Sequence, residues 1–122
     1  MKSFLLVFLG GGLGSALRYL VASAMNQYSK VLPFGTFTVN ILGCLLIGMI
    51  LGYAQRENTL TSNQILLLAT GFCGGFTTFS AFANENLELI KNGEIFNFSI
   101  YTISSILIGV LAVFIGFYLT NR

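Results

Sequence analysis

Charged residues are scarce in this sequence. Only 8% of its 122 residues are Asp, Glu, Lys or Arg, whereas about a quarter of a typical soluble domain is charged. Hydrophobic residues make up 55% of the chain, and its mean hydropathy is +0.83. A soluble protein of this length could not cover its surface with so few charges. The sequence therefore predicts an integral membrane protein with little of the chain outside the bilayer.

Histidine is absent, and the two cysteines, Cys44 and Cys73, lie in apolar runs. The lack of histidine excludes zinc and most transition-metal chemistry. Buried thiols are most often small packing residues, so we expect no disulfide between them. The net charge of +2 is spread thinly, which leaves no basic patch for nucleic acid. With no nucleophile–base pair, phosphate-binding loop or metal cluster, the sequence predicts that the protein is not an enzyme.

Four apolar segments are each close to the roughly 20 residues that a helix needs to cross a bilayer. They span residues 4–25, 34–54, 65–90 and 96–119, and the connections between them are short. Thr61 or Ser62 is expected to cap the third helix, and Asn92-Gly93 to end it. The predicted fold is therefore an all-α membrane protein with four transmembrane helices in a single domain.

The positive charges show almost no bias between the two sides of the membrane. Three lie on the side of the termini, two on the opposite side and one inside the first span: Lys2, Arg56 and Arg122, then Lys30 and Lys91, then Arg18. The positive-inside rule needs a bias to orient a chain. Two interpretations stay open. Either weaker signals set one orientation, or the chain inserts both ways and opposed copies pair as an antiparallel, two-fold symmetric dimer.

Several polar residues lie inside the predicted spans. Asn40 either bonds another helix or donates hydrogen bonds to a desolvated anion. Arg18 either snorkels, or caps carbonyls of another helix, or acts as a vestibule cation that attracts anions. Glu85 is deep enough to line a polar path, whereas Glu88 is expected to pair with Lys91 at the surface.

Hydroxyl groups recur in the fourth span. Tyr101, Ser104 and Ser105 share one face at helical spacing, and Thr102 points elsewhere. Hydroxyls in helices often bond the carbonyl four residues earlier. The stripe alone therefore does not distinguish a polar path from packing.

The segment GFCGGFTTFSAF, residues 71–82, interrupts the third span with glycines and hydroxyl residues. Irregular backbone at membrane depth is tolerated only where it is buried in protein or lines a cavity. We therefore predict a break near mid-membrane, whose freed carbonyls can hold a cation. Phe79 and Phe82 share a face just after it. Their positive ring edges offer a weak, dry host for a small anion; alternatively, both rings fill a helix interface.

Three motifs in order, GGLGSALRY at 11–19, GTFTVNILG at 35–43 and GFCGGFTTFSAF at 71–82, resemble the Fluc (CrcB) family of fluoride channels. The four-span layout extends the resemblance to the whole chain. Two positions depart from the family pattern: Ser15, where the family more often has Ala, and Ala81, where Thr or Ser is common. Neither position is expected to contact the ion.

The resemblance implies a channel in the cell membrane that passively exports cytoplasmic fluoride. It implies an antiparallel, dual-topology homodimer with two separate pores. The edges of Phe79 and Phe82 would form a fluoride-coordinating box shared across protomers, with Asn40 as hydrogen-bond donor. A structural sodium ion at the dimer centre would be held by the backbone carbonyls of Gly74 and Thr77 from both subunits.

The resemblance also implies a hydroxyl track along each pore, which maps to Ser80, Thr38, Tyr101 and Ser105. Glu85 matches a family carboxylate near that track. Two alternatives belong to other classes. A small multidrug-resistance-type transporter has the same size, but it needs a glutamate in its first span, where this chain carries Arg18 and no acid. A non-conducting membrane scaffold would use the polar residues for packing alone.

Overall fold

The computed structural model describes residues 1–57 and 59–122, and in these residues four helical spans are long and apolar enough to cross a membrane. Three of them are continuous: α1 (Lys2–Asn26), α2 (Phe34–Glu57) and α6 (Ile95–Thr120). The third covers Ser62–Lys91 in several pieces. Each predicted span lies inside a helical segment that is a few residues longer. The chain is a multi-pass, all-helical membrane protein, as the sequence predicts.

The third span consists of α3 (Ser62–Ile65), the π-helix η1 (Leu66–Cys73), α4 (Gly74–Phe76) and α5 (Phe79–Lys91). Thr61 caps its start in a capping box, because Gln64 N donates to Thr61 Oγ1 (3.2 Å) and Thr61 N donates to Gln64 Oε1 (2.9 Å). Its end is at Asn92, followed by Gly93 with a positive φ of 75°. Both predicted caps are confirmed. The π-helix was not predicted.

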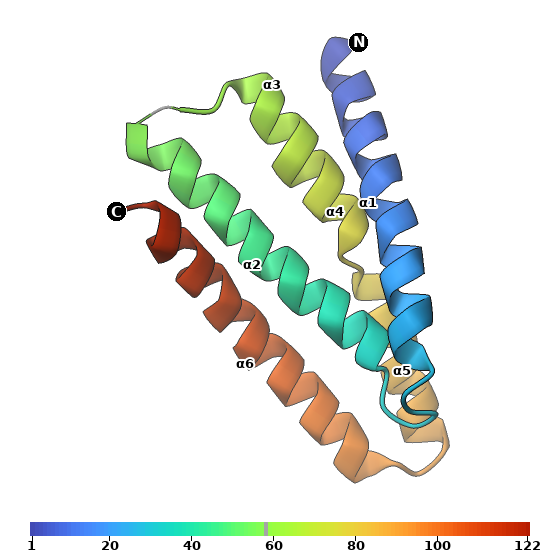
Figure 1. Ribbon diagram of the computed structural model, residues 1–122. Coiled ribbons are helices and arrows are strands. Elements are labelled where there is room, and N and C mark those ends of the chain that lie inside the picture. Colours follow the sequence, from blue (N-terminus) through green and yellow to red (C-terminus); the bar gives the residue numbers. More distant parts are fainter. Residues whose placement is uncertain (58) are drawn as a thin grey trace.

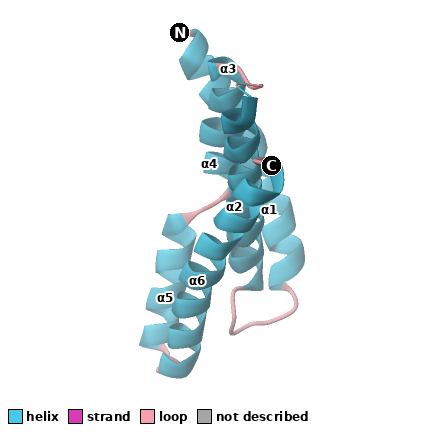
Figure 2. Cartoon of the chain, turned by 90° about the vertical axis from the view of Figure 1, so that its left-hand side faces the viewer, coloured by secondary structure: helices cyan, strands magenta, loops and turns pink. Residues whose placement is uncertain are grey.

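The spans pack in two pairs that meet at α2. α2 lies along α6, while α1 lies against η1 and α4 (Figure 1). Both termini and the start of α3 lie toward one end of the molecule, and the α5–α6 connection lies toward the other (Figure 1). Beyond the break between α4 and α5, α5 is displaced sideways and packs beside the first half of α6 (Figure 2).

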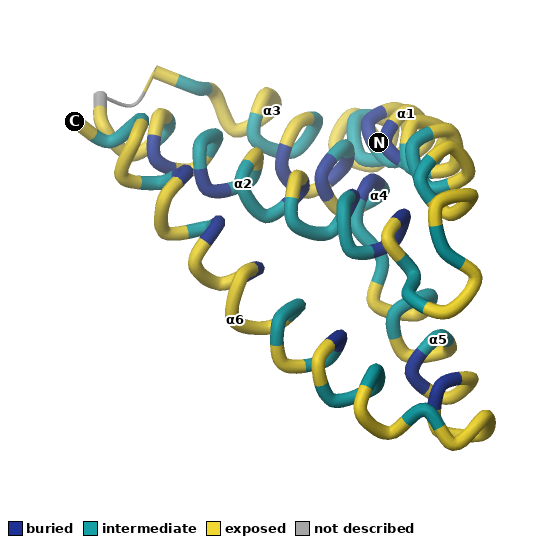
Figure 3. The backbone as a smooth tube through the Cα atoms, turned by 60° about the horizontal axis from the view of Figure 1, so that its bottom comes forward, coloured by how far each residue is buried: buried dark blue, intermediate teal, exposed yellow. Residues whose placement is uncertain are grey.

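Burial is concentrated where the spans meet, and much of α1 and α6 is exposed in the single chain (Figure 3). Large apolar side chains such as Phe8, Leu107 and Phe114 are more than half exposed. In a membrane protein, such surfaces contact lipid or another protein chain, because neither requires polar groups on the helix surface.

Glycines let α1 approach the third span to backbone contact. A methyl group at Gly14 would overlap the carbonyl oxygen of Phe72 and lie 2.8 Å from the amide nitrogen of Phe76. A methyl group at Gly12, on the same helix, would meet nothing within 4 Å. Two pairs of glycines are spaced four residues apart, Gly10 with Gly14 on α1 and Gly71 with Gly75 on the third span. They therefore serve helix packing within the chain.

Replacing Gly14 with alanine is expected to destabilise the fold by roughly 1–3 kcal/mol, because the added methyl group meets backbone that moves only if the helices separate. The melting temperature of the purified protein in detergent measures this. Gly12→Ala is the matched control and should be neutral or slightly stabilising, because alanine favours a helix over glycine. Equal melting temperatures for the two variants would contradict the close approach.

Candidate functional site

The third span breaks at Thr77 and Thr78. α4 ends at Phe76, and the next two residues are extended, with φ/ψ of −91°/161° and −150°/122°. α5 then begins at Phe79. The Thr78 hydroxyl caps it by accepting a hydrogen bond from Ala81 N (3.1 Å). The break lies within the predicted segment 71–82.

The break takes several backbone carbonyls out of helical hydrogen bonding, among them those of Gly74 and Thr77. In a continuous α-helix, the amides of Thr78 and Ala81 would donate to the carbonyls of Gly74 and Thr77. Here Thr78 N donates to Asn40 Oδ1 (2.8 Å), and Ala81 N donates to the Thr78 hydroxyl. The Gly74 and Thr77 carbonyls therefore lose their helical partners, and both residues line one cavity.

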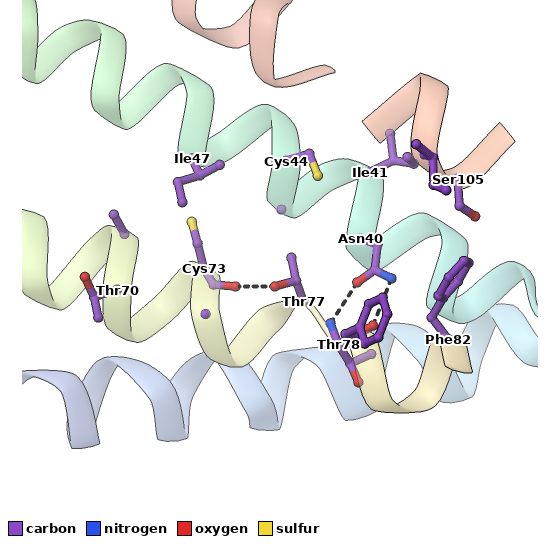
Figure 4. A pocket seen from close by; sticks show the side chains of 15 residues that line it. Asn40, Ile41, Cys44, Ile47, Thr70, Cys73, Thr77, Thr78, Phe82 and Ser105 are labelled. Carbon is purple, nitrogen blue, oxygen red and sulfur yellow. Dashed lines mark hydrogen bonds between the residues drawn. The ribbon is translucent and has the colours of Figure 1, made fainter. Parts of the chain in front are cut away.

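The Asn40 side chain joins α2 to the break with both ends of its amide. Its Oδ1 accepts from Thr78 N, and its Nδ2 donates to Thr78 O (3.1 Å; Figure 4). The amide thus replaces helical partners that the break removes. Nδ2 carries two protons, and the second takes no part in these bonds. Asn40 therefore bonds another helix, as one of the two interpretations held, and keeps a further donor.

Arg18 and Ser15 hold the break from the α1 side. The Gly75 carbonyl would normally bond the amide of Phe79, which lies beyond the break. Instead it accepts hydrogen bonds from Arg18 Nε (2.9 Å) and Ser15 Oγ (3.3 Å). A cation at the carboxyl end of a helix is also favoured by the helix dipole. Of the three roles considered for Arg18, the structure shows carbonyl capping. Arg18 also lines a second cavity, of about 470 Å³, with both polar and apolar residues.

A cavity of about 570 Å³ lies beside the break, between α2, the third span and α6 (Figure 4). Its lining is mostly apolar and includes the free thiols of Cys44 and Cys73. Six of the predicted site residues line it: Asn40, Gly74, Thr77, Phe79, Phe82 and Ser105. Thr38 and Ser80 are not among its lining residues, and the Ser80 hydroxyl lies 3.3 Å from that of Thr78.

Three aromatic rings form a row that starts at the break. The ring centroids of Phe79 and Phe82 are 5.8 Å apart, and those of Phe82 and Tyr101 are 5.1 Å apart. Both pairs are tilted, which turns ring edges toward neighbouring groups. Phe79 is 79% exposed, so this chain leaves the first ring of the row almost uncovered.

Glu85 lies at the far end of the aromatic row. It accepts hydrogen bonds from the Tyr101 hydroxyl (2.9 Å) and from Thr36 Oγ1 (2.7 Å), which fixes the direction of both hydroxyls. Thr36 was not predicted as a site residue. It lies four residues before Asn40 and therefore on the same helix face, and that spacing could have identified it.

The remaining polar residues divide between packing and the cavity. Ser104 bonds the Ile100 carbonyl of its own helix, and Thr102 Oγ1 donates to Asn86 Oδ1 (3.2 Å). Ser105 Oγ is buried without a hydrogen-bond partner within residues 1–57 and 59–122. Lys91 and Glu88 form the expected exposed ion pair, at 3.5 Å. The predicted hydroxyl stripe therefore separates, with only Ser105 left free to bind at the cavity.

These features define a class: a small multi-pass membrane protein in which one cavity is lined by a broken span, with its freed backbone carbonyls and aromatic rings, and by the side-chain amide of a neighbouring helix. The chain belongs to the CrcB family, because its residues 5–117 match the family described as CrcB-like protein, Camphor Resistance (CrcB). The resemblance seen in the three motifs is confirmed.

Relatives similar to this chain over nearly their whole length are named fluoride-specific ion channel FluC. The relative from Phocaeicola vulgatus is 49% identical and covers 99% of this chain and 100% of the relative. The relative from Gloeothece citriformis is 48% identical, and the match covers 100% of this chain and 99% of the relative. The relative from Flavobacterium psychrophilum is 44% identical, and the match covers 95% of this chain and 94% of the relative. These names describe channels and not enzymes, as the sequence predicts.

Proposed function

We propose that this chain is a fluoride-selective ion channel of the cell membrane, which lets cytoplasmic fluoride leave passively down its electrochemical gradient. The observation that carries the proposal is the break at Thr77–Thr78, which brings the ring pair of Phe79 and Phe82 and the amide of Asn40 to one cavity. Similarity over the full chain to relatives named fluoride-specific channels supports fluoride as the ion.

The anion path uses donors that the fold leaves available. A small anion entering a dry passage loses its water and needs hydrogen-bond donors or positive ring edges in exchange. The second Nδ2 proton of Asn40, the unpartnered Ser105 hydroxyl and the edges of Phe79 and Phe82 supply them. By the family resemblance, Tyr101, Thr38 and Ser80 belong to a hydroxyl track beyond the rings; the Tyr101 proton is already donated to Glu85, which orients that hydroxyl.

A second copy of the chain, inserted the opposite way, completes the site. Phe79 is largely exposed and a methyl group at Gly74 would meet nothing within 4 Å, so this face has room for a partner. The even distribution of positive charges is compatible with insertion both ways. An antiparallel homodimer of this kind has two pores, one beside each copy's cavity.

A structural sodium ion fits the carbonyls of the break. Gly74 and Thr77 of each copy offer neutral oxygen atoms that have lost their helical amides, and a two-fold axis brings both pairs together. Oxygen ligands without charge suit a hard monovalent cation, and backbone carbonyls can replace such an ion's hydration shell. The sodium ion would neutralise the carbonyl dipoles at the centre of the dimer.

Efflux from liposomes that contain the purified protein tests the function. Vesicles loaded with fluoride are expected to release it rapidly once a potassium ionophore balances the charge. Matched vesicles loaded with chloride should release it at the rate of protein-free vesicles. Equal release of the two anions, or no release of either, would contradict fluoride-selective conduction.

If the dimer needs two copies inserted in opposite directions, variants fixed in one orientation should conduct fluoride only when both are expressed together. Val31→Lys and Gln55→Lys each add one positive charge on opposite sides of the membrane, which fixes opposite orientations because the starting bias is so small. Each variant expressed alone is expected to lose fluoride efflux from cells, and co-expression should restore it. Full efflux from either variant alone would show that one orientation suffices.

A further inference from the structure

A charged side chain from another span holds the Gly75 carbonyl at the break. Arg18 Nε donates to it at 2.9 Å and Ser15 Oγ at 3.3 Å, both from α1. The same glycine touches α1 through its backbone, because a methyl group there would lie 2.9 Å from the Gly11 Cα. Gly75 is therefore fixed against α1 by both contact and hydrogen bonds.

Gly74, the residue before it, lies on the side of the helix away from α1. A methyl group at Gly74 would meet nothing within 4 Å, and Gly74 lines the large cavity with Thr77. Gly74 and Gly75 lie in the same helical turn, α4, whose φ and ψ angles set the directions of both carbonyls. An unheld Gly75 carbonyl would lack a partner inside the membrane and would turn to find one. Thr77 is tied to the same turn, because its N and Oγ1 both donate to the Cys73 carbonyl (3.0 and 2.9 Å). The anchor of Gly75 on α1 therefore limits how far this turn, with Gly74 and Thr77, can move.

We infer that Arg18, with Ser15 as a weaker second donor, is the positioning residue of the central cation site. By holding the Gly75 carbonyl on α1, it keeps the Gly74 and Thr77 carbonyls directed into the cavity, where the second copy meets them. This rests on the proposed function, because it needs the sodium ion between two copies. It gives Arg18 a role at the cation, distinct from attracting fluoride.

The hydrogen bond and the charge of Arg18 act on a nearby cation with opposite signs. The bond to Gly75 stabilises the arrangement of carbonyls that binds sodium, whereas the guanidinium charge repels the ion. Arg18→Met removes both, with a side chain of similar length. Arg18→Lys keeps the charge and a donor. The sign of the shift in Arg18→Met therefore shows which effect dominates, and Arg18→Lys shows whether a charged donor at this position restores the site.

Thermal unfolding against sodium concentration is the test. The purified dimer is exchanged into N-methylglucamine buffer and its melting temperature is followed as sodium chloride replaces the organic salt at constant ionic strength. Arg18→Met is expected to raise the sodium concentration for half-maximal stabilisation about tenfold or more, the scale of one lost hydrogen bond to a charged group. Arg18→Lys should recover most of this shift, and Ser15→Ala should give about a twofold shift. Ser99→Ala removes a hydroxyl that bonds the Ile95 carbonyl of its own helix, and it should match the wild type.

Three results would overturn the inference. An unchanged sodium midpoint in Arg18→Met would show that the bond to Gly75 does not position the carbonyls. A lowered midpoint would show that repulsion by the charge is the dominant effect. If Arg18→Met does not fold, Ser15→Ala decides, because it also removes a donor to the Gly75 carbonyl; a midpoint equal to the wild type in that variant rejects the role.

The wild-type protein distinguishes failure of the cation site from failure of the proposed channel function. A wild-type dimer whose melting temperature does not respond to sodium would remove the cation site, and with it this role of Arg18. Fluoride efflux by that dimer would still support the channel. A wild-type protein without selective fluoride efflux would remove the function itself.

Discussion

Replacing Asn40 with leucine is expected to abolish fluoride flux and to lower the melting temperature of the protein. The substitution removes the hydrogen bonds to Thr78 N and Thr78 O, at 2.8 and 3.1 Å, within the membrane. Each backbone group that loses a buried partner costs about 1–3 kcal/mol. It also removes the donor offered to the anion, and losing one pre-organised donor lowers rates by roughly a hundredfold in sites of comparable design. Vesicle efflux and thermal unfolding measure the two effects.

Two further variants separate the roles of Asn40. Asn40→Asp keeps an acceptor for Thr78 N but removes both N–H donors and adds negative charge. It should therefore retain more stability than Asn40→Leu and still conduct no fluoride. Asn86→Leu is the control, because Asn86 is a buried amide bonded to the Thr102 side chain and does not line the cavity. Flux within about twofold of wild type in Asn40→Leu would refute this account of the residue.

Replacing Phe82 with isoleucine is expected to reduce fluoride flux by roughly tenfold or more, which corresponds to about 1.4 kcal/mol, within the range of specific aromatic interactions. Isoleucine keeps an apolar side chain but has no positive ring edge. Phe82 lies between Phe79 and Tyr101, so its loss also interrupts the aromatic row. Phe79→Ile should act in the same direction. The measurement is fluoride efflux per dimer, with dimer content checked by size-exclusion chromatography.

The control for the ring variants is Phe114→Ile. Phe114 stacks on Tyr118 at 6.3 Å on α6 and does not line the cavity, so its loss should leave flux unchanged. Folded Phe79→Ile and Phe82→Ile dimers that both conduct at the wild-type rate would mean that the rings only fill a helix interface. That outcome would favour the packing interpretation of the segment 71–82.

The positions of the spans followed directly from hydropathy, because a chain in lipid must satisfy its backbone within each helix. Caps followed from local chemistry as well: Thr61 and Gly93 lie where a hydroxyl acceptor and a positive φ are needed. The break at Thr77–Thr78 was predictable because glycines and hydroxyl residues weaken a helix there. The π-helix Leu66–Cys73 was not predictable. Its hydrogen bonds join residues five apart instead of four, and the same apolar residue types occur in both kinds of helix.

The partners of the polar side chains depended on tertiary packing. The sequence left three roles for Arg18, and only the contact of α1 with Gly75 selects carbonyl capping. The bonds of Glu85 to Thr36 and Tyr101 depend on how α2, α5 and α6 align, which no local pattern encodes. Phe79, Phe82 and Asn40 do meet at one cavity. The ion-contact roles of these three residues, like those of Thr38 and Ser80, stay predictions.

The reversal potential of the current through the reconstituted protein tests passive fluoride conduction most directly. A planar bilayer is given a tenfold fluoride gradient, with equal chloride and equal pH on both sides. The account predicts reversal at the fluoride equilibrium potential, about 59 mV for one charge per tenfold gradient. It also predicts no shift when a chloride or a proton gradient is then imposed. Reversal at a potential set by chloride, or one that moves with the proton gradient, would contradict a fluoride-selective channel.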